Sequence, residues 1–282
     1  MISTDDLMQL GLELAGWARI PSDCGIYYPG TAIKRLLVGL DIGPGDLLLA
    51  RQMGFDAVLA HHFDGCEAVL TAWQLYRRHV ELMMAMGVPH LAAEAAVDER
   101  VEELRLLAHT VNYNRTSGAA RLLRMPFLNI HSPLDELGRR MMQEAVDDLL
   151  RTEPDVTVAE VAAHLNASLR EFQLAPTRIA IRHGDPDAPA RRVVVAHGAL
   201  TNGGADVART YYEHGVDTVI YIHIAPPEVR KLHRLGRGHL IITGHVASDS
   251  LGINAYLAEV ERRGIEVVRL NGIVSPESEE PL

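Results

Sequence analysis

Hydrophobic residues in this chain gather in short runs, most of them bounded by Gly or Pro, with longer amphipathic stretches between them. Residues 35–41, 56–60 and 126–131 contain three such runs in the first half. Short apolar runs of this kind are typical of buried strands in a parallel sheet. The stretches between the runs have the spacing of amphipathic helices. The alternation of strand and helix predicts an α/β fold whose parallel strands are joined by right-handed crossovers.

The first half is expected to begin with a helix. Ser3 and the residues after it combine capping side chains with acidic charges, which suit a helix N-terminus. This helix should end near Trp17, and residues 19–34, which are rich in Gly, Pro and Tyr, predict a loop. Further helices are expected over residues 46–53, 67–86, 91–123 and 134–150.

The second half continues the same alternation of helices and strands. We expect strands over residues 177–181, 192–197, 217–223, 239–243 and 266–270. We expect helices over residues 157–166 and 205–213, from 226 onward, and over 250–263.

Two segments of the second half resemble two segments of the first. Residues 54–62 align with residues 215–223, and both contain a Gly, an Asp and an apolar strand that ends near a His. The pattern H-x-x-x-D-x-L-G begins at His131 and again at His245, each time after a strand and before a helix. An internal repeat of this kind indicates two lobes of similar structure.

We therefore expect an α/β fold with two similar lobes, each with a mainly parallel sheet flanked by helices. A shared site, which we interpret as a metal site below, would lie between the lobes. Lobe 1 would span residues 1–134, with residues 245–282 returning to it, and lobe 2 would span residues 135–244.

Composition and charge exclude several classes of protein. The chain has 282 residues, 48% of them hydrophobic, and no apolar run approaches the ~20 residues that span a bilayer. The first residues lack the basic and apolar segments of a secretion signal, which predicts a cytoplasmic protein without membrane attachment. Cys24 and Cys66 are too few for a disulfide framework and are expected to be reduced. The net charge of −10 argues against binding nucleic acid through its phosphates.

Two adjacent histidines, His61 and His62, follow the apolar run of residues 56–60 and precede an acid and a Gly. In an open α/β sheet, ligands bind at the carboxyl ends of the strands. Neutral imidazole is the commonest metal ligand among side chains, so the pair indicates a metal site. The other interpretation is a pair of polar residues that satisfies a strand-to-helix turn.

If the strand ends converge, they bring a set of imidazoles and carboxylates together. The set consists of His61, His62, Asp135 and Asp249, with His131 and His245. In each His-x-x-x-Asp segment, residues four apart lie on one face once the chain is helical. Nitrogen and oxygen donors without thiolates suit Zn, Fe(II), Mn or Co. This number of donors exceeds what one catalytic zinc uses, so the sequence favours a centre of two metal ions.

Other polar residues near element ends are weaker candidates. His197, His223 and His239 stand at strand ends, whereas the remaining histidines are expected at the surface, in turns or in helix packing. Cys66 follows His62 by four residues, but a free Cys is more often a small buried hydrophobe. Gly203-Gly204 opens a helix and could receive an anion on backbone N–H groups. The G-x-G-x-x-G spacing of a dinucleotide site is absent.

Four motifs, taken together and in order, resemble the Nif-three-like dinuclear metal centre family, whose members are often labelled GTP cyclohydrolase 1 type 2 homologues. The motifs are Leu40-Asp41, Ala60-His61-His62, His131-Ser-Pro-Leu-Asp135 and Gly244-His245-Val-Ala-Ser-Asp249. The resemblance extends from about residue 4 to about residue 273. It implies two α/β lobes with a pair of divalent ions between them, and a ring-shaped homohexamer. Position by position, it implies the metal ligands His61, His62, Asp135, His245 and Asp249.

The sequence departs from the family pattern at three places. Phe63-Asp64 follows the His-His pair, where the family usually has Pro-Leu. Asp249 stands where the family usually has Glu, so bridging of both ions by this shorter side chain is open. The stretch from Val88 to about Met125 is longer than in compact members and is expected to cover the site.

Two functions fit this pattern. The first is a metal-dependent hydrolase of a nucleotide-like or phosphorylated small molecule, with two ions of Zn, Fe or Mn and with Asp41 and His131 orienting a ligand or the attacking water. The cyclohydrolase activity is its most specific version and follows from the resemblance alone. The second is a non-enzymatic metal-binding or adaptor protein that forms a ring-shaped oligomer. A centre closed by Asp64, Cys66 or His223 would favour the second function.

Overall fold

In a computed structural model, which describes residues 1–153 and 155–276, the strands form two separate sheets. The first sheet has the strand order β1-β4-β3-β2-β9 and the second has the order β5-β8-β7-β6. The first consists of β1 (Gly25–Tyr28), β2 (Arg35–Gly39), β3 (Ala57–Ala60), β4 (Phe127–Asn129) and β9 (Glu266–Leu270). The second consists of β5 (Ala180–His183), β6 (Val193–Val195), β7 (Thr218–Tyr221) and β8 (His239–Ile242).

The two sheets share one arrangement of strands. β4, β3 and β2 run parallel, and β1 pairs antiparallel with β4 at the edge. In the same way, β8, β7 and β6 run parallel and β5 pairs antiparallel with β8. The first sheet adds β9, which is parallel to β2. This correspondence confirms the predicted α/β fold of two similar lobes with mainly parallel sheets, and it explains the repeated sequence segments.

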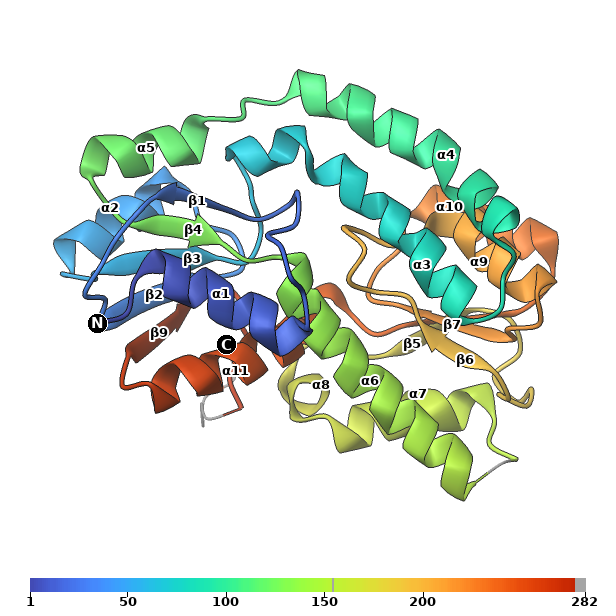
Figure 1. Cartoon of the computed structure of the whole chain (residues 1–282). Helices are drawn as coiled ribbons and strands as arrows, with labels where there is room; N and C mark the ends of the chain where they lie inside the picture. Colours follow the sequence, from blue (N-terminus) through green and yellow to red (C-terminus); the bar gives the residue numbers. More distant parts are fainter. Residues whose placement is uncertain (154, 277–282) are drawn as a thin grey trace.

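Helices flank both sheets (Figure 1). They are α1 (Thr4–Ala15), α2 (Pro44–Gln52), α3 (Arg78–Ala85), α4 (His90–Leu107), α5 (Arg115–Leu123), α6 (Ser132–Thr152), α7 (Val158–Ser168), α8 (Arg170–Leu174), α9 (Gly204–Glu213), α10 (Pro226–Leu235) and α11 (His245–Arg262). Short 3-10 helices are η1 (Glu67–Leu70), η2 (Ala72–Arg77) and η3 (Ala108–Thr110). Within the described ranges, every helix is too short or too polar to cross a membrane.

Two long helices, α6 and α11, connect the lobes by packing into both of their cores. Leu134 of α6 belongs to the core of the first lobe, whereas Met142 lies in the core of the second. Leu251 of α11 lies in the second core and Tyr256 in the first. The predicted lobe boundaries, residues 134 and 244, lie near the starts of these two shared helices. The boundaries stay a prediction.

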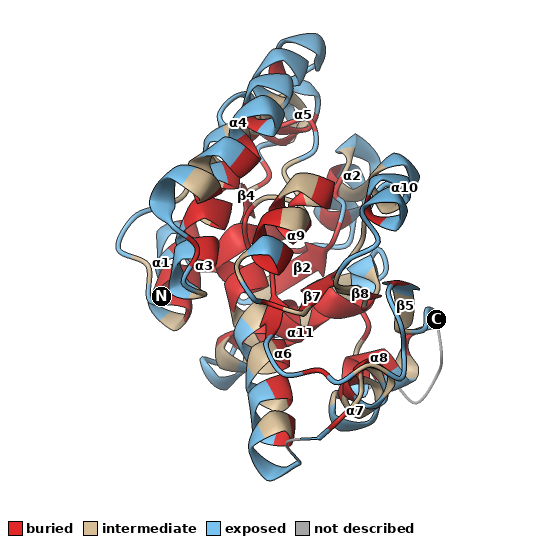
Figure 2. Cartoon of the chain, turned by 90° about the vertical axis from the view of Figure 1, so that its right-hand side faces the viewer, coloured by how far each residue is buried: buried red, intermediate tan, exposed pale blue. Residues whose placement is uncertain are grey.

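Helices α3 and α4 lie side by side across one end of the molecule, and α4 reaches from α5 on the first lobe to α9 on the second (Figure 1). Figure 2 shows the outer face of α4 exposed, whereas buried residues concentrate on the strands and on the inner helix faces. This arrangement leaves the face of α4 that points toward the lobes available to line a hollow between them.

Several elements differ from the sequence expectation, and the helix expected over residues 91–123 is divided into α4, η3 and α5. β1 lies within the expected loop of residues 19–34, because a four-residue edge strand between Gly- and Pro-rich segments leaves little periodic signal. The expected helix of residues 67–86 is broken into η1, η2 and α3, with a break at Thr71. Helix α11 begins at His245 rather than near residue 250, and Gly244 precedes it at φ +105° without a capping side chain.

Candidate metal centre

The candidate site lies where β3, β4 and β8 end. His61 and His62 follow β3 directly, and His131 follows β4 by two residues. Because β3 and β4 are parallel neighbours, their carboxyl ends meet at the same edge of the sheet. His245 follows β8 of the second sheet and opens α11. The structure therefore gathers side chains from the strand ends of both sheets, as the sequence predicts.

Two carboxylates come from the N-terminal turns of α6 and α11. Asp135 lies four residues after His131, the N-cap of α6, and Asp249 lies four residues after His245. This spacing places each carboxylate on the same face as its histidine. Asp135 is 3% exposed and Asp249 is 1% exposed, so both are removed from bulk water. Buried carboxylates require paired charges or metal ions.

The two carboxylates can approach each other because α6 and α11 cross closely at glycines. A Cβ atom on Gly252 would overlap the carbonyl oxygen of Leu134, and one on Gly138 would lie 2.9 Å from the carbonyl oxygen of Ser248. Both glycines are the last residue of an H-x-x-x-D-x-L-G repeat. The repeat therefore encodes the donors and also the close crossing of the helices that present them.

Donor atoms converge on both carboxylates. Asp249 Oδ2 lies 3.0 Å from His245 Nε2, 3.5 Å from His62 Nε2 and 3.7 Å from His61 Nε2. Asp135 Oδ1 lies 3.1 Å from His61 Nε2, and its Oδ2 lies 3.6 Å from His131 Nε2. Three overlapping groups have ligand atoms within 4.8 Å of one another: His61, His62 and His131; His62, His245 and Asp249; His61, Asp135 and Asp249.

Three histidines have their Nδ1 atoms fixed by acceptors. His61 Nδ1 donates to the carbonyl oxygen of Ile130 at 3.1 Å, His62 Nδ1 donates to Asp41 at 2.7 Å, and His131 Nδ1 donates to Asp23 at 2.7 Å. Because these oxygens can only accept, each Nδ1 carries a proton. In the neutral ring the lone pair of Nε2 then points into the cluster, which is the arrangement that metal-ligating histidines adopt.

Buried polar atoms without hydrogen bonds test whether this cluster fits a cation. Among the described residues, ten buried side-chain nitrogen or oxygen atoms have no hydrogen-bond partner, and half of them lie here. They are His61 Nε2, His197 Nε2, Asp135 Oδ1 and both carboxylate oxygens of Asp249. Unsatisfied buried polar atoms are costly, and four of these five belong to His61, Asp135 and Asp249, which form one of the groups that could hold a divalent cation. The donor set therefore fits metal ions.

The charge state of the carboxylates also suits a cation. Burial opposes ionisation of Asp249, but the close imidazoles of His245, His62 and His61 outweigh it and hold the pKa of Asp249 well below its usual value. Burial likewise opposes ionisation of Asp135, and the nearby imidazoles keep its pKa low. Burial lowers the pKa of His61, which favours the neutral ring that binds metal.

Asp41 occupies the exposed edge of the cluster. Its carboxylate is 72% exposed and accepts the hydrogen bond from His62 Nδ1. The pKa of Asp41 is lowered, because this hydrogen bond outweighs partial burial. The sequence assigned a positioning role to Asp41 and His131. The structure places Asp41 in contact with His62, as a positioning residue would be. His131 is instead one of the candidate metal donors, because its Nε2 faces Asp135.

Two residues at the cluster were missed or ranked low from the sequence. His197, two residues after β6, places Nε2 3.4 Å from Asp135 Oδ1 and 3.8 Å from Asp249 Oδ1. Its position at a strand end was a signal, but it lacks a following His-x-x-x-Asp pattern. Asp23 lies in the expected loop before β1 and accepts from His131 Nδ1 and from the hydroxyl of Ser132. Nothing in its local sequence indicates this contact.

His223 faces the cluster with the opposite tautomer. The Asn202 amide is oriented by the N–H of Gly204, which donates to its oxygen at 3.0 Å. The Asn202 amide nitrogen therefore donates to His223 Nδ1 at 3.0 Å, and the ring carries its proton on Nε2. His223 thus offers a hydrogen-bond donor beside His245, with the two ring centroids 4.7 Å apart.

The centre opens to one side. His62, His131, His223 and His245 line a pocket of about 330 Å³ together with Phe63, Asp64, Val69 and Leu200. The side chain of His245 is 44% exposed there. Asp64 pairs with Arg115 at 2.8 Å, and the buried thiol of Cys66 donates to the carbonyl oxygen of Asp64. Neither Asp64 nor Cys66 completes the cluster, and His239 contacts the N–H of Asp185 elsewhere.

The fold and the site together define a class of protein. It is an α/β protein of two similar lobes, with buried histidines and aspartates between them that could hold metal ions. The crystal structure of a NIF3 superfamily protein from Sphaerobacter thermophilus is similar over 96% of this chain and 98% of that chain, with 47% identity and a TM-score of 0.93. The chain belongs to the NIF3 superfamily, which confirms the family resemblance of its four motifs.

More distant structures share the fold alone. The hypothetical protein SA1388 from Staphylococcus aureus is 14% identical over 98% of both chains, with a TM-score of 0.53. The ybgI protein, whose function is given as unknown, is 18% identical over 100% of both chains, also with a TM-score of 0.53. No family model matches the sequence, and no curated protein matches it.

Proposed function

We propose that the protein is a metal-dependent hydrolase with a centre of two divalent ions, which acts on a nucleotide-like or phosphorylated small molecule. The observation that carries this proposal is the overlap of the donor groups. His62 and His245 form one group with Asp249, and His61 and Asp135 form another with the same Asp249. A carboxylate shared by two groups is the feature expected of a residue that bridges two ions.

The first ion would be held by His61, Asp135 and Asp249, and the second by His62, His245 and Asp249. Zn, Fe(II) and Mn suit these nitrogen and oxygen donors. Divalent ions bound in this way supply Lewis acidity and lower the pKa of water. This chemistry is what hydrolysis of a phosphoester or of a nucleotide-like ring requires.

The protein's own side chains would orient the donors and the substrate. Asp41 and Asp23 hold His62 and His131 in the tautomer whose Nε2 faces the cluster. His223 carries its proton on Nε2, so it can donate a hydrogen bond to a substrate oxygen in the pocket. Phe63 stacks edge-on against His131, with centroids 5.3 Å apart, and lines the same pocket.

A non-enzymatic metal-binding or adaptor protein is the alternative, and the open side of the cluster weighs against it. Structural metal sites are usually closed by protein ligands, whereas catalytic sites keep a position open. Here the half-exposed His245 borders a pocket that is large enough for a small molecule. The cyclohydrolase activity remains the most specific form of the proposal, and no base-recognition motif singles it out.

The test is a metal analysis of purified protein together with an activity screen across nucleotides and phosphomonoesters. Turnover should disappear with a chelator and return with one of Zn, Fe(II) or Mn. His62→Ala should lower both metal content and turnover, whereas His239→Ala, at a strand end outside the cluster, should leave both unchanged. Bound metal without turnover of any compound would favour the adaptor function, and full metal content in His62→Ala would contradict the centre itself.

We also propose that the chain forms a homo-oligomer, most simply the ring-shaped hexamer that the family resemblance implies. Large apolar side chains on the outer helices support association, since Leu91 on α4 is 79% exposed and Leu122 on α5 is 85% exposed. Light scattering at micromolar concentration should report a mass six times that of the 31.0 kDa chain. A monomer at that concentration would contradict the proposal.

A further inference from the structure

Three hollows adjoin one another between the metal centre and the middle of α4. The pocket over the histidines shares Phe63, Val69 and Leu200 with a second pocket of about 310 Å³. The second pocket shares Arg100 and Thr201 with a third of about 340 Å³. Because neighbouring pockets share side chains, they adjoin one another, and we describe them together as a groove that starts at the candidate donors.

The middle of this groove is apolar. Trp73 of η2 lines it from one side, and Leu104 and Leu107 of α4 line it from another. Val111, after α4, lies at its edge. Leu107 is 52% exposed and Val111 is 41% exposed, so these side chains border open space rather than a packed core. The helix that the sequence placed over the site thus contributes an apolar wall beside it.

The opposite wall is the loop after β6, which is held firmly. Leu200 lines both the first and the second pocket and has φ +70°, a left-handed conformation that is strained for a leucine. Neighbouring contacts maintain it. Arg78 donates to the carbonyl oxygen of Gly198 at 2.6 Å, and His79 Nε2 donates to that of Thr201 at 2.8 Å. Strain of this kind, supported from behind, is typical of residues that position a ligand.

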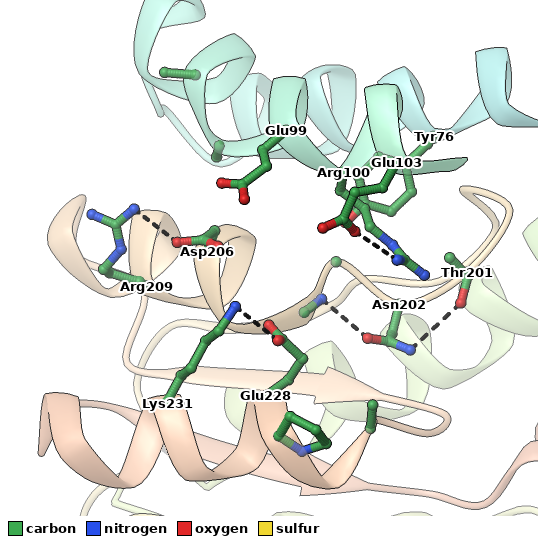
Figure 3. A pocket seen from close by; sticks show the side chains of 16 residues that line it. Tyr76, Glu99, Arg100, Glu103, Thr201, Asn202, Asp206, Arg209, Glu228 and Lys231 are labelled. Carbon is green, nitrogen blue, oxygen red and sulfur yellow. Dashed lines mark hydrogen bonds and ion pairs between the residues drawn. The ribbon is translucent and has the colours of Figure 1, made fainter. Parts of the chain in front are cut away.

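The far end of the groove is polar but does not favour a second phosphate (Figure 3). Its cations are already paired: Arg100 with Glu103 at 2.8 Å, Lys231 with Glu228 at 2.9 Å, and Arg209 with Asp206 at 3.1 Å. Glu228 also accepts from the N–H of Ala205, so the N-terminus of α9 is occupied by a carboxylate of the protein itself. An uncharged or amine-bearing end fits this pocket better than an anion.

We propose that the substrate of this centre carries a flat apolar group, aromatic in the simplest case, next to the group that reacts at the histidines. The apolar group binds between Trp73, Leu107 and Leu200. This inference rests on the proposed hydrolase function, because the reacting group is placed by the metal centre. It adds a substrate class: a phosphoester or nucleotide-like molecule that carries an aryl or similarly apolar group, and whose far end, in the third pocket, forms hydrogen bonds and is not phosphorylated.

The probe pair is phenyl phosphate and methyl phosphate, which differ only in the apolar group. Binding to zinc-loaded protein can be followed through the fluorescence of Trp73, which lines the apolar section. The variant Trp73→Phe should lose the signal. The other tryptophan, Trp17, packs elsewhere, under Arg78. Phenyl phosphate should bind at least tenfold more tightly than methyl phosphate. Equal affinity of the two probes would overturn the proposal.

Two neighbouring leucines provide a matched pair of variants. Leu107 lines the groove and Leu106 does not, yet both lie on α4 and are 52% and 60% exposed. Leu107→Asp should abolish the preference for phenyl over methyl phosphate, and Leu106→Asp should retain it. An equal loss in both variants would contradict the assigned wall. If light scattering shows that Leu107→Asp changes the mass of the oligomer, Leu107 lies at a contact between copies of the chain. That result would also overturn the proposal.

Benzyl alcohol separates this inference from the proposed hydrolase function. It has the ring but no reacting phosphate, so it should still change Trp73 fluorescence in metal-free protein, and Leu107→Asp should abolish the change. If phenyl phosphate is bound selectively but never hydrolysed, the groove assignment holds and the hydrolase proposal fails. If phosphomonoesters are hydrolysed without any preference for the ring, the hydrolase proposal holds and the groove assignment fails.

Discussion

Asp249→Asn is expected to remove nearly all bound divalent metal, whereas Asp64→Asn should leave the metal content unchanged. Asp249 is buried, both of its oxygens lack hydrogen bonds, and it belongs to two of the three donor groups. An amide keeps the shape of the side chain but loses the charge and one acceptor oxygen. We expect metal affinity to fall by more than the roughly 10–100-fold that loss of an outer-shell partner costs.

The measurement is metal content after dialysis, followed by calorimetric titration of the metal-free protein. Asp64 is the matched control, because it borders the same pocket but pairs with Arg115 outside the donor groups. Asp135→Asn provides a graded comparison, since Asp135 belongs to one donor group only. It should lose one ion and keep the other. Equal losses in Asp135→Asn and Asp249→Asn would show that Asp249 is not shared between two ions.

The short side chain of Asp249 is expected to make the affinities of the two metal sites unequal. Asp249 Oδ2 lies 3.0 Å from His245 Nε2, whereas its Oδ1 lies 3.8 Å from His197 Nε2. One oxygen of this shorter side chain thus lies close to His245, on the same helix. The other oxygen lies farther from its nearest imidazole in the second lobe, that of His197. Two separated affinities in the titration of the wild type would agree with this asymmetry.

Each metal-donor residue that the sequence identifies lies in a short, recognisable sequence pattern. His61 and His62 end a short apolar strand between two glycines, and His131 and His245 each begin the same eight-residue repeat. Strand ends of a parallel sheet must meet at one edge, so a strand-end pattern is sufficient to group these residues before any contact is known. The two-lobed α/β fold follows from the same alternation of strand and helix.

The remaining contacts depend on residues far apart in sequence. Asp23 holds His131 across a separation of 108 positions, from a loop whose short strand β1 gives no periodic signal. His197 reaches Asp135 only because β6 ends beside the start of α6. The groove under α4 likewise needs Trp73, Leu107 and Leu200, which come from three separate segments. Long-range packing of this kind has no pattern within a single segment.

Gly252→Ala is expected to lower the free energy of unfolding by more than the ~1–3 kcal/mol typical of overpacking a core. An added Cβ atom would overlap the carbonyl oxygen of Leu134, which is a backbone atom and cannot rotate away. Helices α6 and α11 would have to separate, and both helices pack into the cores of both lobes. The same separation would move Asp249 away from Asp135 and weaken metal binding.

Urea unfolding of metal-free protein measures this effect, and two other glycines calibrate it. Gly118→Ala in α5 meets nothing within 4 Å, so it should stabilise by the ~0.5–1 kcal/mol by which Ala exceeds Gly in a helix. Gly138→Ala should be intermediate, because its Cβ atom would lie 2.9 Å from the carbonyl oxygen of Ser248. It should remain folded with reduced metal affinity, which tests the crossing even if Gly252→Ala does not fold. Wild-type stability and wild-type metal affinity in Gly252→Ala would show that the close crossing of α6 and α11 does not set the distance between the two carboxylates.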